Sequence, residues 1–175
     1  MAGGGSVEVK RVQSAAGKRF EIAIAHLKDK QVKIGWFEGQ KYDDEHSTPI
    51  AAVAAQNEFG NPNQNIPARP FMRPTIAQQE NNWRKISKDG AKEVIEGKRL
   101  IDTVFELIGR KAVGDIKTTI TKIYDPPLSQ ATINARIERE GHSGKFTKRQ
   151  ALTATKPLVD TAEMVNTIIS VIEDA

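Results

Sequence analysis

The amino-acid sequence predicts an α+β fold, in which a small, mainly antiparallel sheet packs against several helices and extended loops. Three segments have strand patterns: residues 7–12 and 31–38 alternate apolar and polar side chains, and residues 167–172 are rich in β-branched residues. The longest helical pattern, residues 100–124, predicts a central helix because apolar residues recur at every third or fourth position. Strands and helices do not alternate regularly as in βαβ units, so we expect one α+β domain over residues 1–175.

Two helix starts are predicted in the N-terminal third of the chain from residues that favour capping. Ser14 can cap a helix that continues to Asp29. Thr48 can cap a second helix with Pro49 in its first position, where the missing N–H had no partner, and alanines continue this helix to Gly60. The alanines predict close packing of this second helix.

Two shorter helices are predicted nearer the C-terminus. Ser129 can cap a helix that runs through Ile137. Asp160 can begin another, with Glu163 three residues later in a capping-box arrangement. This last helix must be short, because the final predicted strand follows it closely.

Apolar stripes predict which faces of the long helices are buried. The stripe of the central helix contains Ile101, Val104, Ile108, Ala112, Ile116, Ile120 and Ile123. The helix predicted over residues 75–96 has a sparser stripe of Ile76, Trp83, Ile86, Ala91, Val94 and Ile95. We expect Ile108 and Ile116 to be buried, and we expect Gly90 to weaken the second helix.

The remaining segments are predicted to lack regular structure. Residues 1–6 form a glycine-rich flexible leader, and residues 39–47 form a long polar loop. Residues 139–155 are polar, contain glycine and show no period, which predicts a mobile loop or arm. Residues 66–74 contain three prolines, so we expect neither regular helix nor central strand there.

Composition excludes several classes of protein. The chain has no cysteine, which removes disulfides, thiolate nucleophiles and cysteine-ligated metal sites. No apolar run is long enough to span a bilayer and no secretory signal opens the sequence, so we expect a cytosolic protein without membrane contact. The net charge of +4 comes from 26 Lys and Arg against 22 Asp and Glu, interspersed along the chain, and indicates little about partners.

Two charged clusters could bind ligands, and each also has a simpler interpretation. Asp43, Asp44 and Glu45, followed by a histidine, have metal-ligand chemistry, but adjacent loop residues rarely converge on one ion. We therefore expect a hydrated acidic loop and no metal. The basic residues Lys145, Lys148 and Arg149 could bind nucleic acid, although a single neighbouring phenylalanine offers the only base-stacking surface, and a solvated loop is the alternative.

No catalytic arrangement is recognisable. Residues 141–144, Gly-His-Ser-Gly, lack the flanking strand and helix of a nucleophile elbow, and no phosphate-binding loop is present. We therefore expect no enzymatic activity and no cofactor.

Alternate positions of the proline-rich segment carry Arg69, Phe71 and Arg73. Stiff extended backbone would hold two guanidinium groups and one aromatic ring in fixed register, which suits a protein interface. The alternative is that Phe71 belongs to the domain's own core while the arginines pair locally. The sequence leaves both alternatives open.

Five blocks together resemble the neck and tail-completion proteins of long-tailed bacteriophages, over roughly residues 31 to 172. The blocks are Asn57-Glu58-Phe59-Gly60, Ile66-Pro67-Ala68-Arg69-Pro70-Phe71-Met72-Arg73-Pro74, Gly114-Asp115-Ile116, Asp125-Pro126-Pro127-Leu128-Ser129 with Thr132-Ile133, and Lys156-Pro157-Leu158-Val159-Asp160-Thr161. One departure is Ala162, where the family pattern has glycine after Asp-Thr. The resemblance does not cover the role of residues 139–155.

The resemblance implies a non-enzymatic virion protein that joins the head connector to the tail. It implies assembly in the host cytoplasm into a closed ring of this chain, with a hexamer or a dodecamer as expected sizes. Its partners would be the connector and the tail tube or tail terminator, with passive DNA contact in the ring lumen. Two alternatives remain: a tail terminator that caps the tube, or a basic nucleic-acid-binding module.

Overall fold

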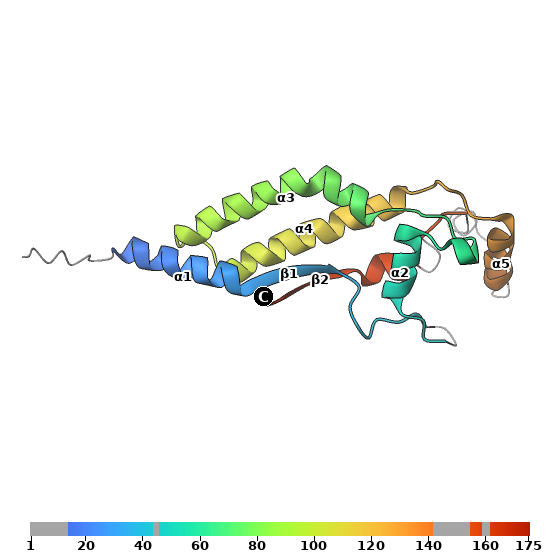
Figure 1. Cartoon of the computed structure of the whole chain (residues 1–175), viewed down its shortest axis with the longest axis horizontal. Helices are drawn as coiled ribbons and strands as arrows, with labels where there is room; N and C mark the ends of the chain where they lie inside the picture. The colour runs from blue at the N-terminus through green and yellow to red at the C-terminus, as the bar shows by residue number, and fades with distance from the viewer. Residues whose placement is uncertain (1–13, 44–45, 142–154, 159–161) are drawn as a thin grey trace, which may run out of the picture.

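The chain forms an elongated arrangement of helices along one two-stranded sheet (Figure 1). The computed structural model describes residues 14–43, 46–141, 155–158 and 162–175. The elements in chain order are α1 (Ala15–Asp29), β1 (Lys30–Gly35), α2 (Ile50–Phe59), a 3-10 turn η1 (Pro62–Gln64), α3 (Met72–Ile95), α4 (Ile101–Lys122), α5 (Gln130–Gly141), α7 (Glu163–Thr167) and β2 (Ile169–Asp174). The predicted α+β class is confirmed, whereas the strand predicted over residues 7–12 and the leader 1–6 lie outside the described residues.

The two longest helices, α3 and α4, pack side by side as an antiparallel pair (Figure 1). Close approach is possible because Gly90 of α3 faces Val104 of α4, and a Cβ at Gly90 would lie 2.4 Å from a methyl carbon of Val104. Polar contacts add to the packing, since the Trp83 indole donates to Asp115 at 2.9 Å. The expectation that Gly90 weakens its helix is therefore incomplete, because the missing side chain is what lets α4 approach.

Strands β1 and β2 form an antiparallel ribbon that joins distant parts of the chain, from Lys30 opposite Asp174 to Gly35 opposite Ile169. Helix α4 packs on one face of this ribbon. At the contact, a Cβ on Gly109 of α4 would lie 2.5 Å from the Ser170 hydroxyl oxygen and 3.4 Å from a Val32 methyl. A glycine at this point of α4 is thus a steric requirement of the helix-on-sheet contact.

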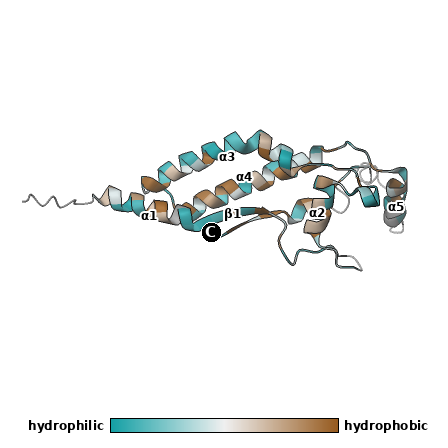
Figure 2. Ribbon diagram, viewed as in Figure 1, coloured by the Kyte–Doolittle hydropathy of each residue, from teal (hydrophilic) through white to brown (hydrophobic). Residues whose placement is uncertain are grey.

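The core lies where α2, the start of α3, the second half of α4 and α7 converge. It consists of Ile50, Ala54, Phe71, Ile116, Ile120, Met164, Val165 and Ile168. Trp36, just after β1, packs edge-on against Phe71 with ring centroids 5.7 Å apart, and its indole donates to the Met164 carbonyl. Figure 2 shows the corresponding pattern, with α2 predominantly hydrophobic and α3 predominantly hydrophilic.

The helix starts agree with the capping predictions in two cases. Ser14 accepts a hydrogen bond from the Gly17 N–H, and Ser129 accepts one from the Thr132 N–H. The helix that follows Ser129 continues to Gly141, beyond the predicted end at Ile137.

Two other capping predictions are wrong. Helix α2 starts one residue later than predicted, with Pro49 as its N-cap and no side-chain cap. The last helix has Ala162 as its N-cap, so Asp160, which lies outside the described residues, does not begin it. In both helices no side chain of the N-cap residue accepts a hydrogen bond from the first turn.

The predicted burial holds for most of the α4 stripe. Ile116 is 1% exposed and belongs to the core, whereas Ile108 is only half-buried. In α3, Ile76 is 45% exposed, which contradicts its predicted place in the buried stripe. Close packing of the α2 alanines holds for Ala54 alone, because its three neighbours Ala51, Ala52 and Ala55 are exposed.

The prediction of a mobile loop or arm over residues 139–155 is wrong for residues 139–141, which complete α5, and residues 142–154 lie outside the described part of the chain. Within the described residues, no helix combines the length and apolarity needed to cross a membrane.

Three glycine substitutions test the close contacts of α4. We expect Gly90→Ala and Gly109→Ala to lower the free energy of unfolding by about 1–3 kcal/mol, because each added methyl overlaps a packed neighbour. Gly114→Ala is the matched control: nothing lies within 4 Å of its Cβ position, so it should raise stability by about 0.5–1 kcal/mol through helix propensity. Urea denaturation measures all three, and equal effects at the three positions would contradict the packing argument.

A fourth substitution tests the backbone at the start of α7. Ala162 has φ 59°, in the left-handed region, where a Cβ costs roughly 1–2 kcal/mol and glycine does not. Ala162→Gly should therefore raise the melting temperature, with a gain of about 0.5–1 kcal/mol after the entropy cost of glycine. A melting temperature at or below that of the unaltered chain would show that Ala162 is unstrained.

Candidate functional site

The blocks of residues 57–60, 66–74 and 125–127 meet at one end of the molecule, around the carboxylate of Glu58. Glu58 lies near the end of α2 and is 4% exposed. Its oxygens accept hydrogen bonds from the backbone N–H groups of Phe71, Met72 and Arg73 at 2.6, 2.8 and 3.2 Å. A side chain from α2 therefore caps the N-terminus of α3. We call Glu58, Arg69 and Arg73, with the backbone groups that they bind, the Glu58 clasp.

This cap explains why a proline-rich segment can enter a helix. The first N–H groups of an α-helix have no partner within the helix. In α3 the N–H groups of Met72 and Arg73 bind Glu58, and Pro74 has no N–H to satisfy. The expectation that residues 66–74 exclude helix is thus correct for residues 66–70 and wrong for residues 72–74, which form the first turn of α3.

The same carboxylate also pairs with a side chain. The Arg73 Nε lies 2.9 Å from Glu58 Oε1, and another guanidinium nitrogen donates to the Glu58 carbonyl at 2.9 Å. Burial raises the pKa of Glu58, but the hydrogen bonds from Arg73 and from the Met72, Phe71 and Arg73 N–H groups outweigh it. The net pKa of Glu58 is lowered, so the carboxylate is ionised.

Arg69 connects the segment before α3 to the residues that follow α4. Its side chain is almost wholly buried and donates to the carbonyls of Pro126 and Pro127 at 2.8 and 3.0 Å. Its own N–H donates to the Asn57 carbonyl at 2.6 Å. Burial, and then the nearby charge of Arg136, lower the pKa of Arg69.

The alternatives for Phe71 are resolved in favour of the core. Its ring is 0% exposed and belongs to the central apolar cluster. Arg69 is 5% exposed and Arg73 pairs locally with Glu58, as the second alternative required. The interpretation of Arg69 and Phe71 as interface residues is therefore corrected, because neither side chain reaches the surface of the chain.

Arg73 keeps a surface role open, because its side chain is 60% exposed. Its guanidinium carbon stacks 5.0 Å from the ring centroid of Phe59, which is 67% exposed. An exposed aromatic ring under a guanidinium that is already fixed by a buried carboxylate forms a rigid surface pair. Aromatic and arginine side chains held in this way are typical of interface hot spots.

Of the other predicted candidates, the structure describes Asp43 alone. Asp43 is exposed in the loop before α2, while Asp44 and Glu45 lie outside the described residues. Lys145, Lys148 and Arg149 also lie outside the described residues. Among the described residues, no group of three potential ligand side chains could hold a metal ion.

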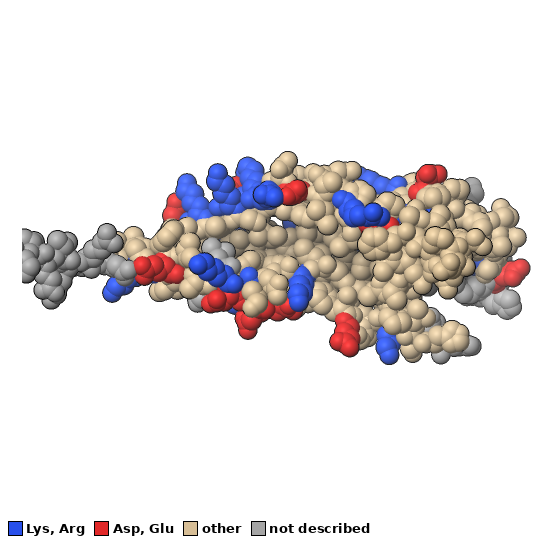
Figure 3. Space-filling model, in the orientation of Figure 1, with Lys and Arg blue, Asp and Glu red and all other residues tan. Residues whose placement is uncertain are grey.

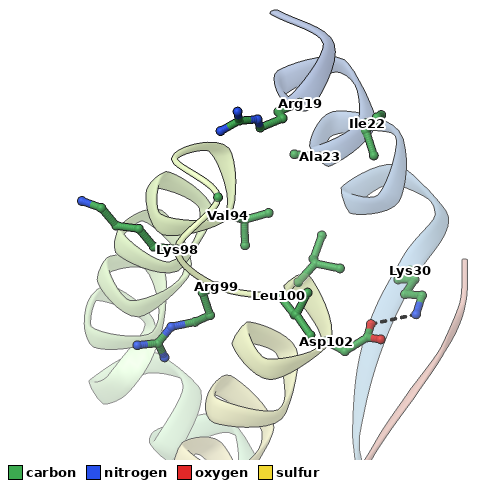
Figure 4. Close-up of a pocket in the computed structure, with 11 residues that line it drawn as sticks. Arg19, Ile22, Ala23, Lys30, Val94, Lys98, Arg99, Leu100 and Asp102 are labelled. Atoms are coloured by element: carbon green, nitrogen blue, oxygen red, sulfur yellow. Dashed lines mark hydrogen bonds and ion pairs between the residues drawn. The ribbon is translucent and has the colours of Figure 1, made fainter. Parts of the chain in front are cut away.

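A cavity of about 560 Å³ lies at the other end of the molecule, between α1 and the turn from α3 to α4 (Figure 4). Ile22 and Leu100 line it, 58% and 77% exposed. Its cations are largely engaged: Lys30 pairs with Asp102 at 2.7 Å, Lys98 with Glu96 at 2.6 Å and Arg99 with Glu93 at 2.5 Å. Three of the four described cations that line this cavity are thus paired with carboxylates, the fourth being Arg19.

Surface charge is distributed in pairs. In Figure 3, Lys and Arg side chains gather over α3, and both signs lie along the opposite side, where α1 and the ribbon run. Three cations of α3, Arg84, Lys85 and Lys92, form ion pairs one turn away with Glu80, Asp89 and Glu96. This pairing disfavours a nucleic-acid surface on α3, because phosphate binding needs unneutralised cations.

No protein-family model matches the chain, and neither a curated protein nor a solved structure matches it.

Sequence reasoning placed Glu58 and Phe59 in a resembling block but did not select either residue as a candidate for the site. A single glutamate near a helix end gives no signal of its own, since its partners lie thirteen to fifteen residues away. The three prolines of residues 66–74, two before α3 and one in its first turn, were the available clue, because a helix that starts there needs an external acceptor for its first N–H groups.

Glu58→Gln tests the clasp. We expect the free energy of unfolding at neutral pH to fall by about 2–4 kcal/mol, because an amide cannot match the charge-assisted bonds to Arg73 and the α3 backbone. The folded pKa of Glu58 is lowered, so its stabilisation is complete above the ordinary glutamate pKa and disappears as the pH falls through the folded pKa.

The measurement is urea denaturation at a series of acidic pH values. The variant should lose less stability between neutral and acidic pH than the unaltered chain. Glu80→Gln, which removes half of an exposed pair with Arg84, is the matched control and should change stability by less than about 0.5 kcal/mol. Parallel pH profiles for the Glu58 variant and the unaltered chain would refute the role of the carboxylate.

Proposed function

We propose that this chain is a structural virion protein of a tailed bacteriophage, a ring-forming neck or tail-completion protein that joins the head connector to the tail. It acts by contact alone, without catalysis or cofactor. It is assembled in the host cytoplasm and remains in the virion. The observation that carries the proposal is the meeting of the resembling blocks in one structural unit.

Residues of four of the five blocks meet in the fold, although the third and fourth blocks lie far from the first two in the sequence. Glu58 of the first block caps the helix that the second block begins, and Arg69 of the second block binds the Pro126 and Pro127 carbonyls of the fourth. Ile116 of the third block lies in the core beside Phe71. Residues that share one structural task are expected to recur together, which supports reading the blocks as a common architecture.

The one departure from the family pattern has a matching physical cause. Ala162 occupies a left-handed backbone conformation, which glycine adopts without strain. A glycine is therefore the residue that this position favours, as the family pattern has it. This agreement between pattern and backbone supports the proposal independently of the clasp.

The Phe59–Arg73 surface pair is the contact that we assign to a neighbouring virion protein. It lies at the α2 end of the molecule and is held rigidly by the buried Glu58. Rigid presentation lowers the entropy lost on binding, which favours an interface that must form at every position of a ring.

Deletion of the gene from the phage genome that carries it tests the proposal. We expect DNA-filled heads without tails and separate tails in electron micrographs of the lysate, with infectivity restored by the gene in trans. Normal infectious particles without the gene would exclude this function. Heads with tubes of uncontrolled length would instead indicate the tail terminator, and steeply salt-dependent DNA binding by the pure chain would indicate the nucleic-acid module.

Phe59→Ser tests the surface pair in the same complementation assay. We expect at least about a tenfold loss of infectious particles, because an aromatic hot spot contributes roughly 2 kcal/mol to its interface. The chain should remain folded, since Phe59 is 67% exposed. Leu100→Ser, at a residue 77% exposed at the opposite end, is the control and should complement fully. Equal complementation by both variants would remove the surface pair from the interface.

A further inference from the structure

Among the residues that the structure describes, no third strand joins either edge of the β1–β2 ribbon. A two-stranded sheet has no central strand, so each strand presents one row of backbone N–H and C=O groups to the outside. Within the described residues, no backbone group of another element hydrogen-bonds to Val32 or Ile34 of β1, nor to Ser170 or Ile172 of β2. Neither edge is therefore closed by the part of the fold that the structure describes.

The ladder determines which residues present these groups. The Ala175 N–H donates to the Asp29 carbonyl at 2.9 Å, so this pair is of the hydrogen-bonded type. Types alternate along an antiparallel ladder, which makes Lys33–Val171 a hydrogen-bonded pair and Val32–Ile172 and Ile34–Ser170 non-hydrogen-bonded pairs. The N–H and C=O groups of the latter four residues therefore point outward, in register for a further strand.

The two edges carry opposite charge. Strand β1 contributes Lys30 and Lys33, and β2 contributes Glu173 and Asp174. Lys33 and Glu173 pair with each other across the ribbon, yet their side chains remain 52% and 36% exposed. A further strand beside β1 is thus favoured if it is acidic, and a further strand beside β2 is favoured if it is basic.

We propose that copies of this chain associate head to tail by sheet extension, with the β1 edge of one copy pairing antiparallel with the β2 edge of the next. The strand that best complements each edge is the opposite strand of a second copy, because β1 and β2 already pair in this way within the chain. Pairing of β1 with β1, or of β2 with β2, would bring like charges together and is disfavoured.

This contact is heterologous, so repetition generates a closed ring or an open helix rather than a two-fold dimer. The inference names the contact between subunits of the proposed ring, and only its biological setting rests on the proposed function. If gene deletion leaves phage assembly intact, sheet extension between copies still stands or falls on its own test.

Single-cysteine variants supply that test, since the natural chain contains no cysteine. Val32 and Ser170 face Gly109 of α4, so Gln31 and Val171, both half-buried, lie on the opposite face of the ribbon. Gln31→Cys and Val171→Cys chains are mixed at high concentration and treated with a bismaleimide that spans about 8 Å, the diagonal distance between neighbouring strands.

We expect a cross-linked product of twice the chain mass in the mixture, and little in either variant alone. A mixture of Gln31→Cys with Lys88→Cys, on the exposed surface of α3, is the control and should give none. Equal product from Gln31→Cys alone would indicate a two-fold contact and overturn the proposal. Absence of product at millimolar chain concentration would overturn it as well.

A charge exchange gives a second readout on folded protein. Lys33→Glu combined with Glu173→Lys preserves an ion pair within the chain but reverses the sign of the charge at positions 33 and 173, while Lys30 and Asp174 stay as they are. Exchanged chains should cross-link with one another as efficiently as unexchanged chains do. Product between exchanged and unexchanged chains should be about two- to fivefold lower, the range expected for exposed ion pairs. Indiscriminate cross-linking would show that the charges do not select the partner.

The chain's own residues 7–12, predicted as a strand, are the competing occupant of the β1 edge. A chain with both Val9→Cys and Gln31→Cys reports on this competition. Efficient cross-linking within that chain, together with no product between copies, would assign the edge to the chain's own segment and overturn the proposal.

Discussion

The ionised carboxylate of Glu58 at the N-terminus of α3 is the interaction on which the rest of the fold depends. It replaces the local cap that α3 lacks, and it fixes the position of Phe71 by accepting the Phe71 N–H. Phe71 is the residue around which α2, α4, α7 and Trp36 pack. A single charge therefore couples the end of one helix, the start of another and the centre of the apolar core. Because the Glu58 carboxylate is buried, removing any one of its hydrogen-bond donors leaves one of its acceptor positions without a partner.

The positions of the long elements could be predicted from the sequence because their signals are local. The apolar period of α4 and the alternation of β1 depend on residues within one element, and the Ser14 cap depends on residues three apart. The start of α3 could not be predicted in this way. The acceptor for its first N–H groups lies on another helix, and local rules for proline see only the missing donors.

At the candidate site, too, local signals could be read from the sequence but tertiary contacts could not. The pattern of Arg69, Phe71 and Arg73 indicated that these residues mattered, but alternation alone could not assign inside and outside. Burial of Arg69 depends on carbonyl acceptors at Pro126 and Pro127, more than fifty residues away. Exposure of Phe59 depends on how α2 lies against α3. Both follow from tertiary packing, which a single sequence does not encode in any short window.

The ribbon pairs β1, which follows α1, with β2, the last of the described elements, so α2 to α7 lie between the two partners in the sequence. During synthesis β1 cannot pair with β2 until α2 to α7 have emerged from the ribosome. Contacts of such long sequence separation form late, because the loop between them must first be closed. Until β2 is synthesised, a nascent chain therefore contains the basic strand β1 but not the acidic strand that pairs with it. Like-charged β1 strands of neighbouring nascent chains repel each other, and the proposed pairing between copies requires a chain in which β2 has already been synthesised.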